Sequence, residues 1–182
     1  MRTFSPRLVL VGGAILLTLA IGCATDANKG RSREQLLKAA GPPQDSGMLP
    51  VKKANLPELP DGAGPMDRDA PDEFTPTPSN LYYRVLRKGK RKPKSFDIVR
   101  VHYRGWLNDG HTFDSSYDRQ EPAEFTLSSV VPGWTEGLQL IGVGGMIELE
   151  IPPRLGYGAQ GKPPSVPPNS TLHFIVELIE IK

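Results

Sequence analysis

The sequence predicts an α+β domain in its C-terminal half, an antiparallel sheet that carries a single short helix. Two patterns predict it. Several segments alternate apolar and polar side chains, which is typical of strands buried on one face. One other segment spaces its apolar residues as an amphipathic helix does. An antiparallel sheet with one helix packed on it belongs to the α+β class. Aromatic residues indicate the same region, because only Phe4 and Phe74 precede Tyr82.

Residues 1–22 have the form of a signal peptide. Arg2 and Arg7 supply a positive start, and an apolar run follows over residues 8–21. Such a run fits a signal-peptide core and is short for a bilayer span. The run ends at Cys23, the single cysteine of the chain, so neither an internal disulfide nor a multi-thiolate metal site is expected.

The apolar run and Cys23 together resemble a bacterial lipoprotein signal, with Ala20 where leucine is more usual. The resemblance implies cleavage before Cys23 and lipid on its thiol, where each buried CH₂ contributes ~0.8 kcal/mol to membrane binding. Ala24 and Thr25 carry no acidic retention signal. We therefore expect a lipid anchor in a bacterial membrane, the outer one favoured, with the protein facing the periplasm. The alternative is an ordinary secretory signal followed by an incidental cysteine.

Residues 23–80 are expected to form, after the lipidated cysteine, a disordered proline-rich tether. Nine prolines fall in this stretch and Phe74 is its only aromatic residue. It therefore offers little apolar area to offset the entropy lost on ordering. A short helix over residues 32–41 is the one exception predicted here. The folded domain is expected over residues 81–182.

Within that domain, alternation predicts four strands. They cover residues 97–107, 123–127, 146–151 and 171–181. Between the second and third, Trp134, Leu138 and Ile141 recur at helical spacing. They predict one amphipathic helix over residues 132–142, opened by Pro132.

Two connections are distinctive. Residues 152–170 form a long loop rich in proline and glycine, with Tyr157 between two glycines. Long loops inside compact domains are usually binding segments or lids, so we favour a functional loop over a tolerated insertion. The basic stretch over residues 88–94 contains proline and glycine and joins two strands. We interpret it as a solvated hairpin loop rather than a patch for nucleic acid or lipid.

Charge and motif content exclude several classes of function. The net charge of +2 includes Arg2 and Arg7, and without them 20 basic residues balance 20 acidic ones. A near-neutral mature chain does not indicate a nucleic-acid-binding protein. The three histidines lack metal-ligand spacing, and neither a nucleophile elbow nor a phosphate loop is present. No metal or other cofactor is expected.

Three ordered blocks carry a resemblance to a known family. They are VHYRGWLNDGHTFDSS (101–116), VVPGWTEGLQLI (130–141) and GYGAQG with VPPNSTLHFIVEL (156–178). Together they resemble the FKBP-type peptidyl-prolyl cis-trans isomerases, the immunophilins that bind macrolides, over residues 81–182. The resemblance implies a curled five-stranded antiparallel sheet wrapped round one short α-helix, with an apolar pocket between them.

The resemblance also implies roles for individual residues. Trp134 is expected as the pocket floor, and Val130 and Val131 along one side. The aromatic walls are expected to be Tyr103, Phe113, Phe125 and Phe174.

At the rim, the resemblance implies Asp114 near Arg119. It also implies that the Tyr157 hydroxyl and the Val131 amide bond substrate carbonyls. Asp114, Tyr157, Phe113 and Trp134 are the residues expected to act in catalysis. Ala123, where an aromatic residue is frequent, and Lys162 depart from the family pattern. Both are expected at the pocket edge, where they bear on substrate preference and macrolide affinity.

The function implied is isomerisation of X-Pro bonds in exported proteins, which can limit folding. Its expected partners are proline-containing polypeptides and, as possible inhibitors, macrolides; a monomer is expected because no long heptad segment appears. One alternative is a non-catalytic, lipid-anchored binding module or chaperone that uses the same pocket. Another is a purely structural tether with the domain as its head.

Overall fold

The computed structural model describes residues 52–182. The expected signal peptide, Cys23 and the helix predicted over residues 32–41 lie outside the described residues. The elements, in chain order, are β1 (Lys52–Lys53), β2 (Glu73–Pro76), β3 (Tyr82–Arg87), β4 (Ile98–Trp106), β5 (Thr112–Ser115), β6 (Ala123–Thr126), the 3-10 turn η1 (Leu127–Ser129), α2 (Pro132–Leu138), β7 (Met146–Ile151), the 3-10 turn η2 (Pro153–Leu155) and β8 (Leu172–Ile181). Within this part of the chain, no helix has the length and apolar character needed to cross a membrane.

All strand pairs in the described part are antiparallel, in the order β1-β2-β3-β7-β8-β4-β5. The long strand β4 pairs with β8 along one edge, and its other edge is shared by β6 and β5. The predicted α+β class, an antiparallel sheet with one helix, is confirmed. The expected number of five strands is wrong, because the described residues contain eight.

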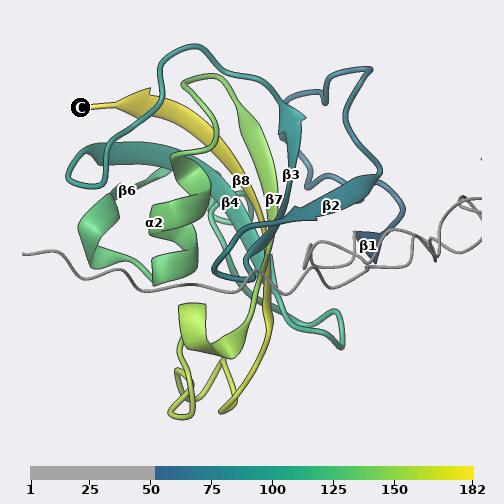
Figure 1. Cartoon of the computed structure of the whole chain (residues 1–182). Helices are drawn as coiled ribbons and strands as arrows, with labels where there is room; N and C mark the ends of the chain where they lie inside the picture. Colours follow the sequence, from purple (N-terminus) through teal and green to yellow (C-terminus); the bar gives the residue numbers. More distant parts are fainter. Residues whose placement is uncertain (1–51) are drawn as a thin grey trace, which may run out of the picture. The chain divides into compact units, whose positions relative to one another are not determined.

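Helix α2 packs against strand β7 on one face of the sheet (Figure 1). The helix backbone approaches the side chains of β7 more closely than a Cβ atom on the helix would allow. Two glycines inside this short helix explain the contact, although glycine usually disfavours a helix interior. A Cβ on Gly133 would stand 2.6 Å from Ile151, and one on Gly137 would stand 2.7 Å from Leu149. The glycines thus allow the helix to press Trp134 into the domain, where that side chain is 4% exposed.

Residues 52–80 are part of the folded unit, so the expectation of a disordered tether over 23–80 is wrong for this segment. Its Leu59, Ala63 and Met66 pack against a second apolar cluster on the opposite face of the sheet from α2. That cluster is formed by the fully buried Leu86, Met146 and Ile175, with Trp106 beside it. Burial of one such side chain contributes ~1.5–3 kcal/mol, so an outer face of this kind needs a cover.

A buried arginine fastens this segment, the arm (residues 52–80), to the sheet. The Arg84 guanidinium donates to Glu148 Oε2 at 2.5 Å, and its other nitrogens donate to the carbonyl oxygens of Ala54 and Asn55 at 3.0 and 2.6 Å. It also lies 4.7 Å above the centre of the Phe74 ring. Burial raises the pKa of Glu148 above its ordinary value, and the pairing with Arg84 opposes that rise without cancelling it.

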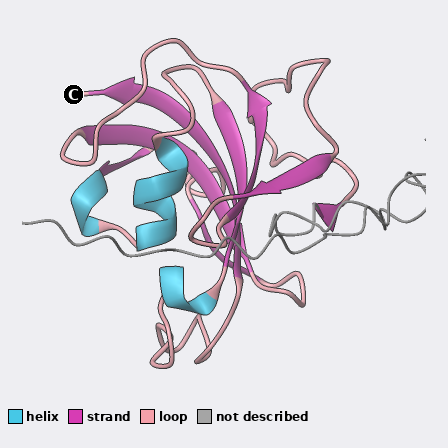
Figure 2. Cartoon of the chain, in the orientation of Figure 1, coloured by secondary structure: helices cyan, strands magenta, loops and turns pink. Residues whose placement is uncertain are grey.

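The basic stretch 88–94 is a loop, as predicted, but it is not a hairpin. It joins β3 to β4, and β7 and β8 lie between those two strands in the sheet. Figure 2 shows the other long connection, between β7 and β8, extending past the end of the sheet with one short helical turn.

The Arg84–Glu148 pair gives a test of the arm. Arg84→Met should lower the free energy of unfolding by about 3–5 kcal/mol near neutral pH, because it leaves the Glu148 carboxylate buried without a counter-charge. The deficit should shrink as the pH falls, since the raised pKa of Glu148 allows protonation to remove that charge. Urea denaturation at neutral and mildly acidic pH measures both effects.

The double variant Arg84→Met/Glu148→Leu is the control and should regain much of the loss. An equal deficit in both variants at all pH values would show that the contacts to the arm, rather than the ion pair, account for the stability.

Candidate active site

A cavity of about 340 Å³ opens between α2 and the curled strands. Side chains from six helices and strands and from two loops meet there. The size falls within the range of about 300–1,000 Å³ typical of small-molecule sites. Its lining residues are Tyr103, Phe113, Asp114, Phe125, Ser129, Val130, Val131, Trp134, Tyr157, Lys162 and Phe174.

The indole of Trp134 is the centre of the aromatic lining. Its ring meets those of Tyr103, Phe125 and Phe174 edge to face, with centroids 5.2, 5.6 and 5.2 Å away. Phe113 meets Phe174 in the same manner at 5.5 Å. Edge-to-face contacts of this kind add stability beyond burial, so the rings hold one another around the cavity. The buried indole N–H finds no hydrogen-bond acceptor among the described residues.

A glycine in β4 makes room for two of these rings. A Cβ on Gly105 would stand 2.5 Å from the Phe174 ring and 2.7 Å from the Phe113 ring. Any larger side chain would displace the wall of the cavity. Gly105 is a functional position that the sequence analysis missed, and a glycine inside a strand pattern is the signal that could have indicated it.

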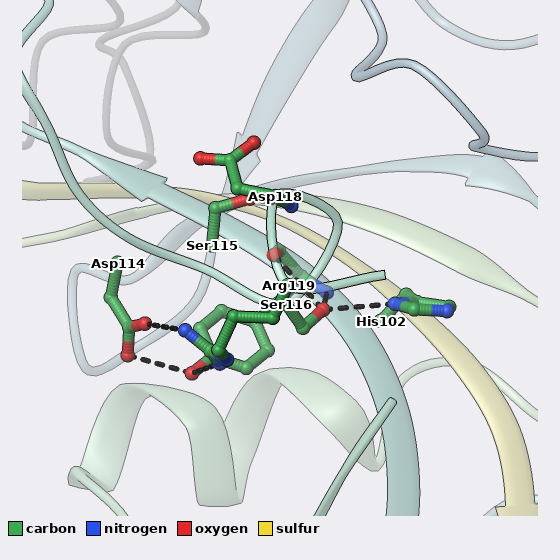
Figure 3. A network of polar contacts seen from close by, with 7 residues as sticks. His102, Asp114, Ser115, Ser116, Asp118 and Arg119 are labelled. Atoms are coloured by element: carbon green, nitrogen blue, oxygen red, sulfur yellow. Dashed lines mark hydrogen bonds and ion pairs between the residues drawn. The ribbon is translucent and has the colours of Figure 1, made fainter. Parts of the chain in front are cut away.

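Asp114, Tyr103 and Arg119 form a closed polar triangle beside the cavity. Figure 3 labels two of its members, Asp114 and Arg119. The Tyr103 hydroxyl donates to Asp114 Oδ2 at 2.6 Å, and Arg119 Nη1 donates to Asp114 Oδ1 at 2.6 Å. Arg119 Nη2 also donates to the Tyr103 hydroxyl oxygen, at 3.0 Å. Both carboxylate oxygens and the hydroxyl are therefore fixed by three hydrogen bonds.

This triangle sets the charges at the site. Partial burial would raise the pKa of Asp114, but the hydrogen bonds from Tyr103 and Arg119 outweigh it and lower that pKa below its ordinary value. Burial, with the hydrogen bond to Asp114, raises the pKa of Tyr103 to about 12. Near neutral pH, Asp114 is thus an anion and Tyr103 a neutral donor.

Behind the triangle, a buried serine holds the backbone of Tyr103. The Tyr103 N–H donates to Ser116 Oγ at 2.7 Å, and the Ser116 N–H donates to the Tyr103 carbonyl at 2.9 Å. His102 Nδ1 shares a hydrogen bond of 3.0 Å with Ser116 Oγ (Figure 3). The His102 ring stacks on that of Tyr117. Neither Ser116 nor His102 was identified from sequence, because their role depends on which backbone atoms the turn brings close.

Two hydrogen-bond donors at the cavity remain free. Neither the Tyr157 hydroxyl nor the Val131 N–H has a hydrogen-bond partner among the described residues, although both residues line the cavity. Lys162 Nζ lies 5.5 Å above the Tyr157 ring. A ligand carbonyl entering the cavity can therefore meet donors that no intramolecular contact occupies.

The residues expected at the pocket converge, with two exceptions. Arg119 does not line the cavity and acts on it through Asp114 and Tyr103. Ala123 was expected at the pocket edge and is not among the lining residues; it packs on the core and pairs with Val101 across β6 and β4. Ser129 lines the cavity and was not predicted. Residues 52–182 contain no cluster of potential metal ligands.

An antiparallel sheet with one helix, enclosing an aromatic cavity with a fixed carboxylate at its rim, defines the class of protein. The family model of the FKBP-type peptidyl-prolyl cis-trans isomerases matches residues 89–179, and the chain belongs to that family. It is 52% identical over 106 residues to a probable FKBP-type peptidyl-prolyl cis-trans isomerase of Haemophilus influenzae, a match covering 58% of this chain and 44% of that protein.

The chain is also 53% identical over 105 residues to the FKBP-type isomerase FkpA of Escherichia coli K12, covering 57% of this chain and 38% of FkpA. The crystal structure of Escherichia coli FkpA superimposes with a TM-score of 0.58 at 51% identity, over 60% of this chain and 51% of that one. A peptidyl-prolyl isomerase structure from Pseudomonas syringae gives a TM-score of 0.56 at 34% identity, over 60% and 80%. The matches span less than half the length of the two curated relatives.

The polar triangle makes a measurable prediction. Tyr103→Phe and Arg119→Gln should each raise the pKa of Asp114, because each removes a hydrogen bond to the carboxylate. Carboxyl carbon NMR titration measures this. In the native protein, the pKa of Asp114 is lower than the ordinary value of 3.8, so ionised Asp114 stabilises the fold at any pH above 3.8. This contribution is lost as the pH falls through the lower pKa of the folded state.

Arg100→Gln is the matched control, because Arg100 pairs with Glu180 elsewhere on the surface. An Asp114 titration midpoint that stays the same in both triangle variants would contradict the described hydrogen bonds.

Proposed function

We propose that this chain catalyses cis-trans isomerisation of X-Pro bonds in exported polypeptides from a lipid anchor. Membership of the family supports the activity. The observation that carries the proposal for this chain is the aromatic cavity with an ionised carboxylate and free donors at its edge. It offers an apolar space for a prolyl ring, with hydrogen-bonding groups where the adjoining peptide groups would lie.

The reaction breaks no covalent bond, and this explains the chemistry of the site. The barrier of ~18–20 kcal/mol is the amide resonance lost when the C–N bond twists. The planar amide has the larger charge separation and is solvated better by water. A cavity walled by Phe113, Phe125 and Phe174 over Trp134 removes that water, and so favours the twisted, less polar state.

The free donors and the carboxylate have different roles in this mechanism. The Tyr157 hydroxyl and the Val131 N–H would bind carbonyl oxygens of the client and hold the chain while the prolyl bond turns. A carboxylate only accepts hydrogen bonds, so Asp114 cannot bind a carbonyl oxygen directly. Its fixed negative charge would act through space on the carbonyl carbon, which becomes more electrophilic as resonance is lost.

Location and partners are part of the proposal. The signal-like residues 1–22 and Cys23 support a lipid anchor facing the periplasm, with the outer membrane favoured, where newly exported chains fold. Proline-containing segments of such chains are the proposed clients, and macrolides that fill the cavity are expected to compete with them. Ala123 does not line the cavity but packs against the core. Its departure from the family pattern is therefore a weaker argument for a module that binds without catalysis.

Two substitutions test the mechanism. Asp114→Ala should lower kcat/KM on a short proline peptide by about tenfold, through loss of transition-state stabilisation. Tyr157→Phe removes one hydrogen bond and should cost about threefold to tenfold. A protease-coupled isomerisation assay measures both, and acceleration of a proline-limited refolding reaction separates catalysis from binding alone.

Asp118→Ala is the control, because this exposed aspartate lies on the same turn and lines no cavity. Native circular dichroism with undiminished turnover in Asp114→Ala would remove Asp114 from the mechanism. Undiminished turnover in Tyr157→Phe would remove that hydroxyl.

The anchor is tested separately. Cys23→Ser in the full chain should move the protein from the membrane fraction to the soluble periplasm and abolish incorporation of labelled palmitate, since no other cysteine is available. Isomerase activity of the released protein should be retained. Palmitate labelling or membrane retention in this variant would contradict the lipoprotein assignment.

A further inference from the structure

A second, shallow groove adjoins the cavity at Val130. It has a volume of about 520 Å³, is more open than the aromatic cavity, and shares Val130 with it. The remaining lining residues come from α2 and the residue that follows it, from η1 and from the loop before β4: Ser95, Ser128, Pro132, Thr135, Glu136 and Gln139. A chain leaving the cavity past Val130 would therefore enter this groove.

Backbone contacts hold the loop that forms one wall. The Lys90 N–H donates to the Val143 carbonyl at 3.1 Å, and the Val143 N–H donates to the Arg91 carbonyl at 2.9 Å. Pro93 is buried, and the Leu127 N–H donates to the Asp97 carbonyl at 3.0 Å. The loop is thus fixed both to the β7 side of the domain and to η1.

This fixed loop presents an unusual surface. Phe96 is 68% exposed and Ile98 41%, and they are two of the three large apolar side chains exposed among the described residues. Lys90, Lys92 and Lys94 are also exposed and form no ion pair within residues 52–182. The loop therefore carries three lysines without an ion pair and an exposed aromatic ring, above whose centre Lys94 Nζ lies at 5.8 Å. Its Ser95 lines the groove.

The polar groups in the groove are partly unused. Thr135 Oγ1 donates to the Leu127 carbonyl, and Gln139 donates to the Thr135 carbonyl, which leaves the Gln139 side-chain oxygen available. The hydroxyls of Ser95 and Ser128 have no hydrogen-bond partner in the described part of the chain. These groups suit the alternating donors and acceptors of an extended polypeptide backbone.

We propose that this groove binds the part of the client chain that flanks the prolyl bond, and that the loop around Phe96 selects clients with acidic and apolar residues there. The proposal rests on the proposed isomerase function and names its substrate class. Lys94, next to Ser95 in the groove wall, favours acidic client side chains at the loop, whereas the Glu136 carboxylate disfavours them inside the groove itself. Phe96 offers an apolar contact, and Lys162 adds a positive charge at the cavity itself.

A polypeptide fits the combined site better than a membrane surface does. A lipid layer would contact the lysines and Phe96 but would not enter the aromatic cavity that adjoins the groove at Val130. An extended chain, at about 3.3 Å per residue, can occupy both from one prolyl anchor.

The test compares two substrates and two variants. One substrate is a short Ala-Ala-Pro-Phe peptide confined to the cavity; the other has the same core extended on both sides with glutamate and leucine. Lys94→Gln/Phe96→Ser should lower kcat/KM for the extended peptide about threefold to tenfold, mainly through KM, and leave the short peptide unchanged. The acidic extension should also lose its advantage at high salt.

Arg68→Gln/Leu56→Ser is the matched control, removing one exposed cation and one exposed apolar side chain from the arm. It should affect neither substrate. Equal effects of Lys94→Gln/Phe96→Ser on both peptides, or none on the extended one, would overturn the proposal. Loss of binding to phosphatidylglycerol-containing vesicles with unchanged kinetics on the extended peptide would overturn it in favour of a membrane contact.

The test also separates this proposal from the one beneath it. If the native chain fails to accelerate isomerisation of the short peptide, the proposed enzymatic function is wrong. Fluorescence anisotropy then still measures how tightly the labelled extended peptide binds. Weaker binding by Lys94→Gln/Phe96→Ser than by the matched control supports the groove proposal, and equal binding refutes it.

Discussion

The close contact between α2 and β7 is the constraint on which the site depends. Gly133 and Gly137 bring the helix backbone against the side chains of Ile151 and Leu149. This proximity carries Trp134 into the middle of the aromatic rings. The indole N–H is buried there without an acceptor among residues 52–182, and an unpaired buried donor costs about 1–3 kcal/mol. The position of Trp134 is thus determined by the packing of its ring, at the cost of an unpaired indole N–H.

The sheet that supports this contact has two apolar faces. One faces α2 and the cavity, and the other is covered by the arm, which Arg84 fastens through its ion pair and its bonds to arm carbonyls. The strand most deeply involved, β7, is buried on both sides along almost its whole length. The arm thus covers the outer face of the strand whose inner face contacts α2.

Electrostatics at the rim complement this apolar interior. Asp114 remains ionised because Tyr103 and Arg119 hold it, and Ser116 fixes the backbone from which Tyr103 extends. The charge is held in place in the free protein, so the proposed reaction would require no reorganisation of this group. Outside the rim, the shallow groove adjoins the cavity at Val130, and we propose that it extends the site along a client chain.

The sequence by itself determined the strand periodicity of the domain, its single helix and, through three family-like blocks, nearly all the side chains that line the cavity. Local patterns carry that information because alternation and helical spacing mark whichever face is apolar. It did not reveal that the arm is part of the fold. Many prolines and few aromatic residues indicate that a segment is unstable alone, but they do not show whether it packs on the surface of a neighbouring sheet. Tertiary structure alone decided that Gly105 makes room for two rings, that Ala123 lies off the cavity and that Ser116 holds Tyr103, since each depends on atoms brought together from distant strands.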